Sequence, residues 1–423
     1  MRILLINQDW FAKEWREEGH EVFIWGPSPD YDFHLSRPLS PLQEITDQCN
    51  PDLIVVHDNS SPLIFTGLGE SEIPRIFYSV DAQHHTHYHK LIASAFDHTF
   101  VAQKDYLPEY EKVGNPVSWL PLWASRFVEA SEKKKYDSVF VGTMNPQLNP
   151  DRVAFFSELQ KHVPLLIERG EFWNIFPFAE IVVNQTVKSD LNFRVFEAMM
   201  CGALLLTESS GNGLFDLFQD NKHLVTYQKG DVSSAAEAIN RLLADRPLCR
   251  KIAKAGRDEI LSKHLARHRA DEVAKIAFNL KRRRDGSQMF GLMVNYSYLA
   301  ASFSKNEKAL AKAAMTQSMY CAERAINGDE FLHQDAAPHL VLAATYYDSI
   351  TPGRIGAEIM RRVVGTRPNQ LLVAMGVIRD FLNHGESDLA RDLAKQINPD
   401  KVEEIFHTSE KVVQGLLDSM LST

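Results

Sequence analysis

The sequence predicts an α/β protein with two consecutive Rossmann-like domains and a C-terminal all-α helical-repeat domain. Through the first part of the chain, short apolar runs alternate with longer amphipathic stretches, the pattern of strands and helices wound into a parallel sheet. At residue 136 this pattern starts again after a polar, basic segment. Near residue 285 alanine-rich periodic helices replace the strand signals. The predicted divisions are 1–128, 129–264, a crossing helix at 265–284, and 285–423.

The first domain contains the strand candidates of one parallel sheet. Gly19 follows a charged helix and precedes the second strand, where a glycine can take the left-handed conformation that ends a helix. The expected strands are Arg2–Ile6, Glu21–Trp25, Leu53–Val56, Arg75–Tyr78, His98–Val101 and Val117–Leu120.

The second domain repeats this alternation. Its expected strands are Ser138–Val141, Pro164–Ile167, Glu180–Val183, Ala203–Thr207 and His223–Thr226, and its expected helices are Pro150–Lys161, Arg194–Cys201, Ser233–Ala244 and Leu248–Lys263. Two doubly wound domains of similar size place a crevice at the carboxyl ends of both sheets, where such folds bind ligands.

The third domain shows weak internal repetition. The sequence LVLA at 340–343 recurs as LLVA at 371–374, and Pro338, Pro368 and Pro399 are nearly evenly spaced. This spacing resembles paired-helix repeats of the tetratricopeptide type, whose concave surface binds peptides or proteins. An irregular helical bundle is an equal alternative.

Composition limits the classes of function. The formal charge of −9 argues against a nucleic-acid-binding protein, since neutralising phosphates needs a basic face. The basic runs Lys133–Lys135 and Lys281–Arg284 lie at predicted domain junctions and fit solvated linkers. The N-terminus lacks a signal-peptide pattern, no segment approaches a membrane span, and the four cysteines are scattered. A cytoplasmic location fits these features.

The segment KSDLNFRVFEAMMCGALLLTE at 188–208 is the most informative part of the chain. Phe193, Phe196 and Met200 fall at helical spacing on an apolar face, whereas Arg194 and Glu197 share another face. A glycine then ends the helix, and an apolar run follows that reads as a strand buried in a parallel sheet. The helix therefore has a buried face and a face free for chemistry.

The amino terminus of this helix, at Asn192, is expected to lie near the interdomain crevice. Unpaired backbone amides, the positive end of the helix dipole and the Arg194 guanidinium together suit a diphosphate. Glu197, one turn further on, is placed to accept hydrogen bonds from ribose hydroxyls. The alternative is that Arg194 and Glu197 form only a surface ion pair.

A cluster of titratable residues follows the strand that ends near residue 80. It comprises Asp81, His84, His85, His87 and His89. Asp81, or else His84, could serve as a base or stabilise developing positive charge at the crevice. His87 and His89 are expected on an exposed helix face. His85, His89 and Asp81 could coordinate zinc, but neither an HExxH motif nor a cysteine supports this, so no metal site is predicted.

The segment NFRVFEAMMCGALLLTE at 192–208 resembles the signature of retaining nucleotide-sugar glycosyltransferases of the GT-B fold, and within them the group related to the spore maturation protein CgeB. The segment YSVDAQHHTHYHKLIASAFDHTFVAQKDYLPEY at 78–110 is similar to the same group's first-domain signature, and GHEV at 19–22 and VFVGT at 139–143 also fit. The resemblance covers roughly the first 280 residues and leaves the helical domain outside.

The resemblance implies that the second domain holds a nucleotide diphosphate sugar, such as a UDP-sugar, and that the first domain holds the acceptor. Glu197 then binds the ribose, Arg194 and Lys188 meet the diphosphate, and the loops after Gly142 and Asn184 line the donor pocket. Such enzymes generally need neither a metal nor a cofactor besides the donor.

Two departures from the family pattern affect the sugar and acceptor contacts. Many relatives carry a second carboxylate eight residues before the ribose-binding one, and Ser189 stands there in this chain, with Asp190 expected to face elsewhere. Gln8, Asp9 and Trp10 replace the usual glycine pair after the first strand.

The predicted function is a hexosyltransferase-type glycosyltransferase, with a protein acceptor or a dimer partner at the helical domain. A nucleotide-sugar epimerase or hydrolase on the same frame is the first alternative. A non-catalytic interaction protein working through the helical domain is the second.

Overall fold

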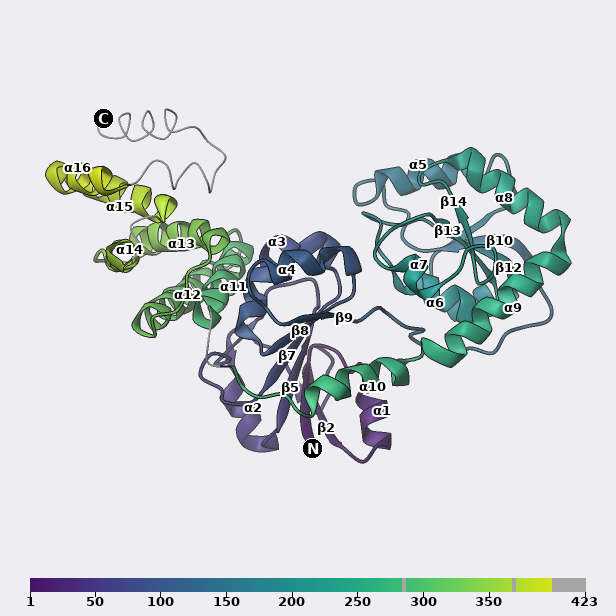
Figure 1. Cartoon of the computed structure of the whole chain (residues 1–423), viewed down its shortest axis with the longest axis horizontal. Helices are drawn as coiled ribbons and strands as arrows, with labels where there is room; N and C mark the ends of the chain where they lie inside the picture. Colours follow the sequence, from purple (N-terminus) through teal and green to yellow (C-terminus); the bar gives the residue numbers. More distant parts are fainter. Residues whose placement is uncertain (284–286, 367–369, 398–423) are drawn as a thin grey trace.

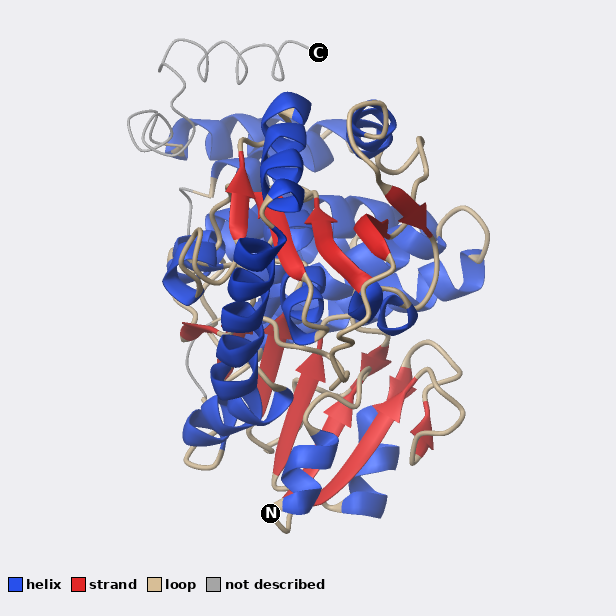
Figure 2. Cartoon of the chain, turned by 90° about the vertical axis from the view of Figure 1, so that its right-hand side faces the viewer, coloured by secondary structure: helices blue, strands red, loops and turns tan. Residues whose placement is uncertain are grey.

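The structure is a computed structural model that describes residues 1–283, 287–366 and 370–397. Two parallel sheets form separate α/β domains, and a helical region lies on the side of the first domain away from the second (Figure 1). Seen from the side of the second domain, the two sheets appear one above the other, with the N-terminus beside the lower sheet (Figure 2).

The first sheet has seven parallel strands in the order β3-β2-β1-β5-β7-β8-β9. The six predicted strands are all present, and Arg2–Ile6 and His98–Val101 have the predicted bounds. The sheet comprises β1 (Arg2–Ile6), β2 (Glu21–Gly26), β3 (Phe33–His34), β5 (Leu53–His57), β7 (Arg75–Ser79), β8 (His98–Val101) and β9 (Val117–Trp119). Its helices are α1 (Ala12–Glu17), α2 (Leu42–Cys49), α3 (Ala82–Ile92) and α4 (Leu107–Glu111), and β4 (Ser40–Pro41) pairs with β6 (Phe65–Thr66).

The second sheet has five parallel strands in the order β11-β10-β12-β13-β14. They are β10 (Tyr136–Val141), β11 (Leu166–Glu168), β12 (Ala179–Asn184), β13 (Leu204–Glu208) and β14 (Val225–Tyr227). The helices are α5 (Pro150–Leu159), α6 (Phe193–Met200), α7 (Leu214–Leu217), α8 (Val232–Ala244) and α9 (Arg246–Lys263). Every residue of β12 and β13 is buried, as expected for central strands covered on both faces.

The chain returns from the second domain to the first through α10 (Ala266–Ala277), which lies against α1 (Figure 1). The predicted crossing helix extended to residue 284, but α10 ends at Ala277. Beyond it, the Arg282 guanidinium donates to Asp97 Oδ1 at 2.8 Å and fastens the chain to the first domain. The basic run at 281–284 is thus partly used in an internal ion pair rather than being only a solvated linker.

The helical region consists of α11 (Gln288–Phe303), α12 (Lys308–Asn327), α13 (Ala337–Ile350), α14 (Ile355–Thr366), α15 (Leu371–Asn383) and α16 (Ser387–Gln396), each packed on the next. The two similar tetrapeptides at 340–343 and 371–374 fall in α13 and α15, the first helices of successive pairs. Pro338 lies in α13, whereas Pro368 and Pro399 lie outside the described residues. The repeat character of this region stays a prediction.

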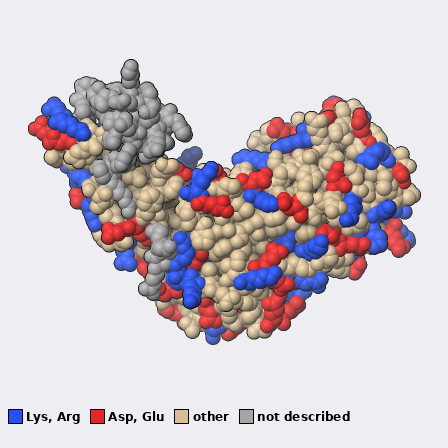
Figure 3. Space-filling model, in the orientation of Figure 1, with Lys and Arg blue, Asp and Glu red and all other residues tan. Residues whose placement is uncertain are grey.

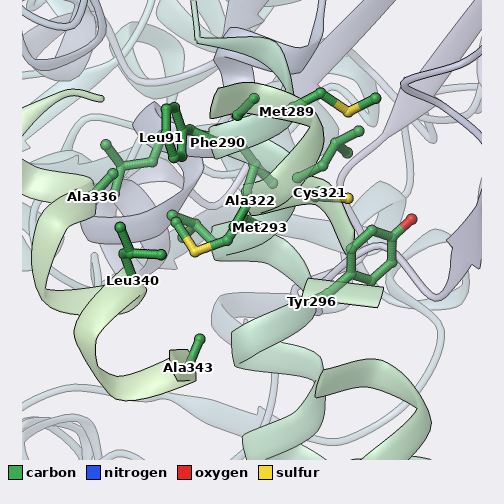
Figure 4. Close-up of a cluster of buried hydrophobic side chains, with 14 of the residues drawn as sticks. Leu91, Met289, Phe290, Met293, Tyr296, Cys321, Ala322, Ala336, Leu340 and Ala343 are labelled. Carbon is green, nitrogen blue, oxygen red and sulfur yellow. The ribbon is translucent and has the colours of Figure 1, made fainter. Parts of the chain in front are cut away.

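The first helix of this region is continuous with the core of the first domain. Leu91 of α3, Phe290 and Met293 of α11 and Leu340 of α13 belong to one buried cluster (Figure 4). Two hydrogen bonds join the Asn295 side chain to the backbone of Leu63, at 2.7 and 3.0 Å. The division predicted at residue 285 therefore separates types of secondary structure, but not two independent hydrophobic cores.

Charged side chains of both signs are interspersed on the face shown in Figure 3. None of the described helices is long and apolar enough to cross a membrane. The four cysteines are all free and buried.

Candidate active site between the two sheets

The helix α6 is fixed by its apolar face, which includes the fully buried Phe196 and Met199. Its N-cap, Asn192, has an extended backbone (φ −87°, ψ 167°), and its side chain does not cap the helix. The buried Oδ1 atom of Asn192 has no hydrogen-bond partner among the described residues. The helix thus begins next to β12 with a buried acceptor atom that is unpaired among the described residues.

Arg194 points from the first turn of α6 to the carboxyl ends of β10 and β12. Its Nη1 donates to Asn184 Oδ1 at 2.8 Å, and its Nη2 donates to the Val141 carbonyl oxygen at 2.9 Å. The guanidinium also lies 4.6 Å from the ring centroid of Phe140, close enough for a cation–π interaction. Burial lowers the pKa of Arg194 to about 10, so the group stays charged at neutral pH.

Gly142 follows β10 at the point where Arg194 packs. A Cβ atom at this position would lie 2.8 Å from Arg194 Nη2 and 2.8 Å from Phe140 Cζ. The absence of a side chain therefore allows the guanidinium to lie against the end of the strand. Sequence reasoning placed Gly142 and Asn184 in this region, and the structure brings both to Arg194.

Further charged residues surround this position. Arg152 of α5 donates from Nε to Gln185 Oε1 at 3.1 Å. Asp190 bonds within its own loop: its Oδ1 accepts a hydrogen bond from the Val187 amide at 2.7 Å. Burial raises the pKa of Asp190, while the nearby charges of Arg194 and Arg152 lower it.

The loop between β12 and α6 reaches the first domain. Lys188 and Ser189 both have left-handed backbones, with φ of 54° and 63°. Lys188 Nζ donates to the Gln83 carbonyl oxygen of α3 at 3.3 Å, and Ser189 Oγ accepts from Lys229 Nζ at 2.6 Å. Non-glycine residues pay conformational energy for this backbone, and such strain concentrates at functional sites.

Glu197 does not pair with Arg194. Its Oε1 accepts a hydrogen bond from Ser125 Oγ at 2.7 Å, so it contacts the segment that joins the two domains. Burial raises the pKa of Glu197, and the Ser125 hydrogen bond opposes this shift. The surface ion pair considered from the sequence is therefore not what the structure shows.

Asp81 and His84 lie at the amino end of α3, directly after β7. Asp81 Oδ2 accepts a hydrogen bond from Ser60 Oγ at 2.5 Å, and Asp81 Oδ1 accepts one from Gln83 Nε2 at 3.3 Å. His84 is exposed. Since Lys188 of the second domain bonds to Gln83, this end of α3 faces the β12–α6 loop.

Asp58 supports this end of α3 and was not predicted from the sequence. Its carboxylate accepts hydrogen bonds from the amides of Ser60 at 2.7 Å, Val80 at 3.2 Å and Asp81 at 2.9 Å. Burial raises the pKa of Asp58, and the amide hydrogen bonds oppose that shift. Its position directly after β5, at the ligand-binding edge of a parallel sheet, was the signal that could have identified it.

Two further histidines of the cluster, His87 and His89, differ in exposure. His87 is exposed as predicted, but the expectation for His89 was wrong, because His89 is fully buried. Its Nδ1 lies 2.8 Å from Ser79 Oγ, and burial holds its pKa well below the ordinary value. No group of three or more His, Cys, Asp or Glu within the described ranges is arranged to hold a metal ion.

Residues of the two domains contact each other directly beside this region. Gln103 Oε1 accepts from the Leu191 amide at 2.8 Å, and Asp105 Oδ2 accepts from the Asn212 amide at 2.9 Å. Phe193 at the start of α6 packs its ring against Trp10 and Trp123 of the first domain, with centroids 6.1 and 5.3 Å apart. Trp10, in the loop after the first strand, is therefore part of the interdomain contact.

Comparison with known proteins relates one part of this chain to a described family. Residues 125–275, which cover the second domain and most of α10, match the family described as glycosyl transferase-like. No curated protein matches the chain.

Solved structures give the fold. Sucrose-phosphate synthase from Thermosynechococcus elongatus matches with a TM-score of 0.50 and 11% identity, over 65% of this chain and 98% of that one. HepE from Anabaena in complex with UDP-glucose has a TM-score of 0.49, 12% identity and coverage of 65% and 98%. A glycosyltransferase from Rickettsia africae has a TM-score of 0.48, 10% identity and coverage of 65% and 97%. The likeness to the synthase agrees with a GT-B arrangement of the two α/β domains.

Proposed function

We propose that the chain is a hexosyltransferase-type glycosyltransferase that uses a nucleotide diphosphate sugar, such as a UDP-sugar. The observation that carries this proposal is the constellation at the start of α6, inside the segment that matches the glycosyl transferase-like family. Arg194 is held in place by Asn184 and the Val141 carbonyl group, and Arg152 adds a second guanidinium. Two positive charges next to a helix amino terminus suit a diphosphate.

In this proposal Arg194, Arg152 and Lys188 stabilise the negative charge that develops on the departing diphosphate. Stabilisation of this kind is strongest where the donors are fixed before the reaction, as Arg194 is here. Glu197 accepts hydrogen bonds from the ribose hydroxyls, and Asn192 presents its unpaired Oδ1 to the donor. Because cationic side chains meet the diphosphate charge, we propose that the reaction needs no metal.

The first domain contributes the catalytic polar group. Asp81, with His84 as the second candidate, lies at the end of α3 to which Lys188 bonds across the domains. We assign Asp81 to the acceptor or to the developing positive charge of the sugar. Retention of configuration and closer kinship with the CgeB-related group rest on the sequence resemblance.

We further propose that the acceptor is a polypeptide. The helical region is built into the domain that would hold the acceptor, through α11, and it exposes large apolar side chains such as Leu342 and Ile355. Free buried cysteines favour a reducing compartment, the cytoplasm.

A thermal-shift screen with uridine, guanosine and thymidine diphosphates tests this function. Binding of one diphosphate at a hundred times its dissociation constant should stabilise the protein by about 2.7 kcal/mol. A non-catalytic interaction protein should respond to none of the three.

A further inference from the structure

A cavity of about 410 Å³ lies between α11, α12 and α13. Its lining is mostly apolar and includes Tyr298, Ala301, Met315, His339, Leu342 and Tyr346. This volume falls within the range of small-ligand sites, which combine an apolar lining with a few polar groups.

Two of the polar side chains at this cavity are already paired, because the hydroxyls of Ser297 and Ser304 donate to carbonyl oxygens of α11, both at 2.8 Å. The Tyr298 hydroxyl, the Tyr346 hydroxyl and the His339 ring form no hydrogen bond with another of the described residues. The Tyr298 and His339 rings lie 5.1 Å apart. A ring that enters the cavity would therefore meet aromatic faces together with hydrogen-bonding groups that are free to engage it.

The cavity lies beside α3, because α11, which lines it, packs on α3. The two helices run antiparallel. Near the start of α11, a Cβ at Gly291 would lie 2.7 Å from the Leu91 carbonyl oxygen. Two turns later, the Tyr298 ring lies 4.8 Å from Tyr88 and 5.8 Å from His87. The end of α11 that lines the cavity therefore lies toward the end of α3 where Asp81 is placed.

The helical region is also tied to the loop that holds Asp81. Asn295 bonds to the backbone of Leu63, and Ser60 in the same loop donates to Asp81. Tyr296, next to Asn295, donates from its hydroxyl to the Phe65 carbonyl oxygen at 2.7 Å. The packing of α11 on this loop therefore fixes the distance between the cavity and Asp81.

We propose that this cavity binds an aromatic side chain of a polypeptide acceptor and so anchors the acceptor beside the active site. The inference rests on the proposed glycosyltransferase function and specifies how its acceptor is recognised. A polypeptide fits better than a small molecule because exposed apolar side chains lie both at the cavity and on the next helix. Leu342, which lines the cavity, is 68% exposed, and Ile355 of α14 is 48% exposed.

The geometry gives the expected spacing along the acceptor. Six residues of α3 separate Asp81 from His87, or about 9 Å at 1.5 Å per residue. The ring contact between His87 and Tyr298 adds 5.8 Å. An extended chain covers this combined distance in about four or five residues. The surface is hollowed above α3, between the second domain and the helical region, where such a chain could lie (Figure 3).

The first experiment titrates N-acetyl-L-tryptophanamide into the full-length protein and follows the imidazole NMR signals of His339 and His87. We expect both signals to shift, with a dissociation constant on the order of 1 mM, because one buried aromatic side chain supplies only a few kcal/mol. Ala301→Trp should weaken this binding at least about tenfold by filling the cavity. Ala313→Trp is the matched control, since Ala313 is also exposed but does not line the cavity.

The second experiment offers a random nonapeptide library together with the nucleotide sugar that the protein hydrolyses. Modified peptides should carry an aromatic residue about four or five positions from the modified one, and Ala301→Trp should remove this enrichment. Peptides accepted without aromatic enrichment, or amide binding that Ala301→Trp leaves unchanged, would overturn the anchor. A library without any accepted peptide would overturn it too, and continued diphosphate binding would show that the donor proposal had survived.

Discussion

Replacing Gly142 by alanine adds one methyl group at the most crowded point of the proposed donor site. The new Cβ would lie 2.8 Å from both Arg194 Nη2 and Phe140 Cζ, well inside van der Waals contact. The β10 backbone is held in the sheet by β11 and β12, so the guanidinium must move instead. Its hydrogen bonds to the Val141 carbonyl oxygen and to Asn184 Oδ1, at 2.9 and 2.8 Å, leave little tolerance for that shift.

The size of the effect follows from the bond that is disturbed. A hydrogen bond to a charged group contributes about 1.5–3 kcal/mol, which corresponds to a loss of roughly 10- to 150-fold in affinity for the diphosphate. The charge of Arg194 is unchanged in this variant, so only its position is tested.

Calorimetric titration of a nucleoside diphosphate and of the matching nucleoside measures this effect. Gly142→Ala should weaken binding of the diphosphate and leave the nucleoside nearly unaffected. Gly365→Ala is the control, because a Cβ at Gly365 meets no atom within 4 Å. A folded Gly142→Ala protein with full diphosphate affinity would refute the assignment of Arg194 to the diphosphate.

Three further outcomes are expected. Gly291→Val should lower the free energy of urea unfolding by about 1–3 kcal/mol relative to Gly365→Val, because the new Cβ would collide with Leu91 and push α11 away from α3. Equal stabilities of the two variants would mean that the helical region is not packed as described. Burial lowers the pKa of His57 to about 4, so between pH 6.5 and about 4 the unfolded chain binds a proton at His57 that the folded chain does not bind. Stability from this group is present above pH 6.5 and falls by about 3 kcal/mol as the pH drops toward 4, and His57→Gln should reduce the pH dependence of thermal unfolding in that window. Asp81→Asn should slow sugar transfer about a hundredfold with diphosphate affinity unchanged, and an equal loss of both would place Asp81 on the donor instead.

The sequence was sufficient for the longer strands because their apolar runs are unambiguous, whereas the two-residue strands β3, β4 and β6 were not predicted. Leu204–Leu206 of β13, for example, is buried on both faces and could hardly be anything other than a central strand. The amphipathic pattern of α6 likewise predicted which face carries Arg194 and Glu197. What sequence reasoning missed depends on contacts between distant segments.

His89 and α11 illustrate this limit. His89 looked exposed because its partner, Ser79, lies on another element, and nothing in the helix pattern reveals their 2.8 Å contact. The helix α11 is apolar nearly all round, which fits burial between two layers, but its packing on α3 could not be read from the chain. The partner of Glu197, Ser125, lies 72 residues away and was equally invisible.

Release of nucleoside diphosphate from a panel of nucleotide diphosphate sugars tests the central claim most directly. The purified full-length protein should release the diphosphate from at least one of these donors, slowly without an acceptor. Arg194→Ala should reduce the rate by about 10- to 100-fold, since one charged hydrogen-bonding group is lost from the diphosphate site. Release from none of the donors, or an undiminished rate in a folded Arg194→Ala variant, would contradict the account.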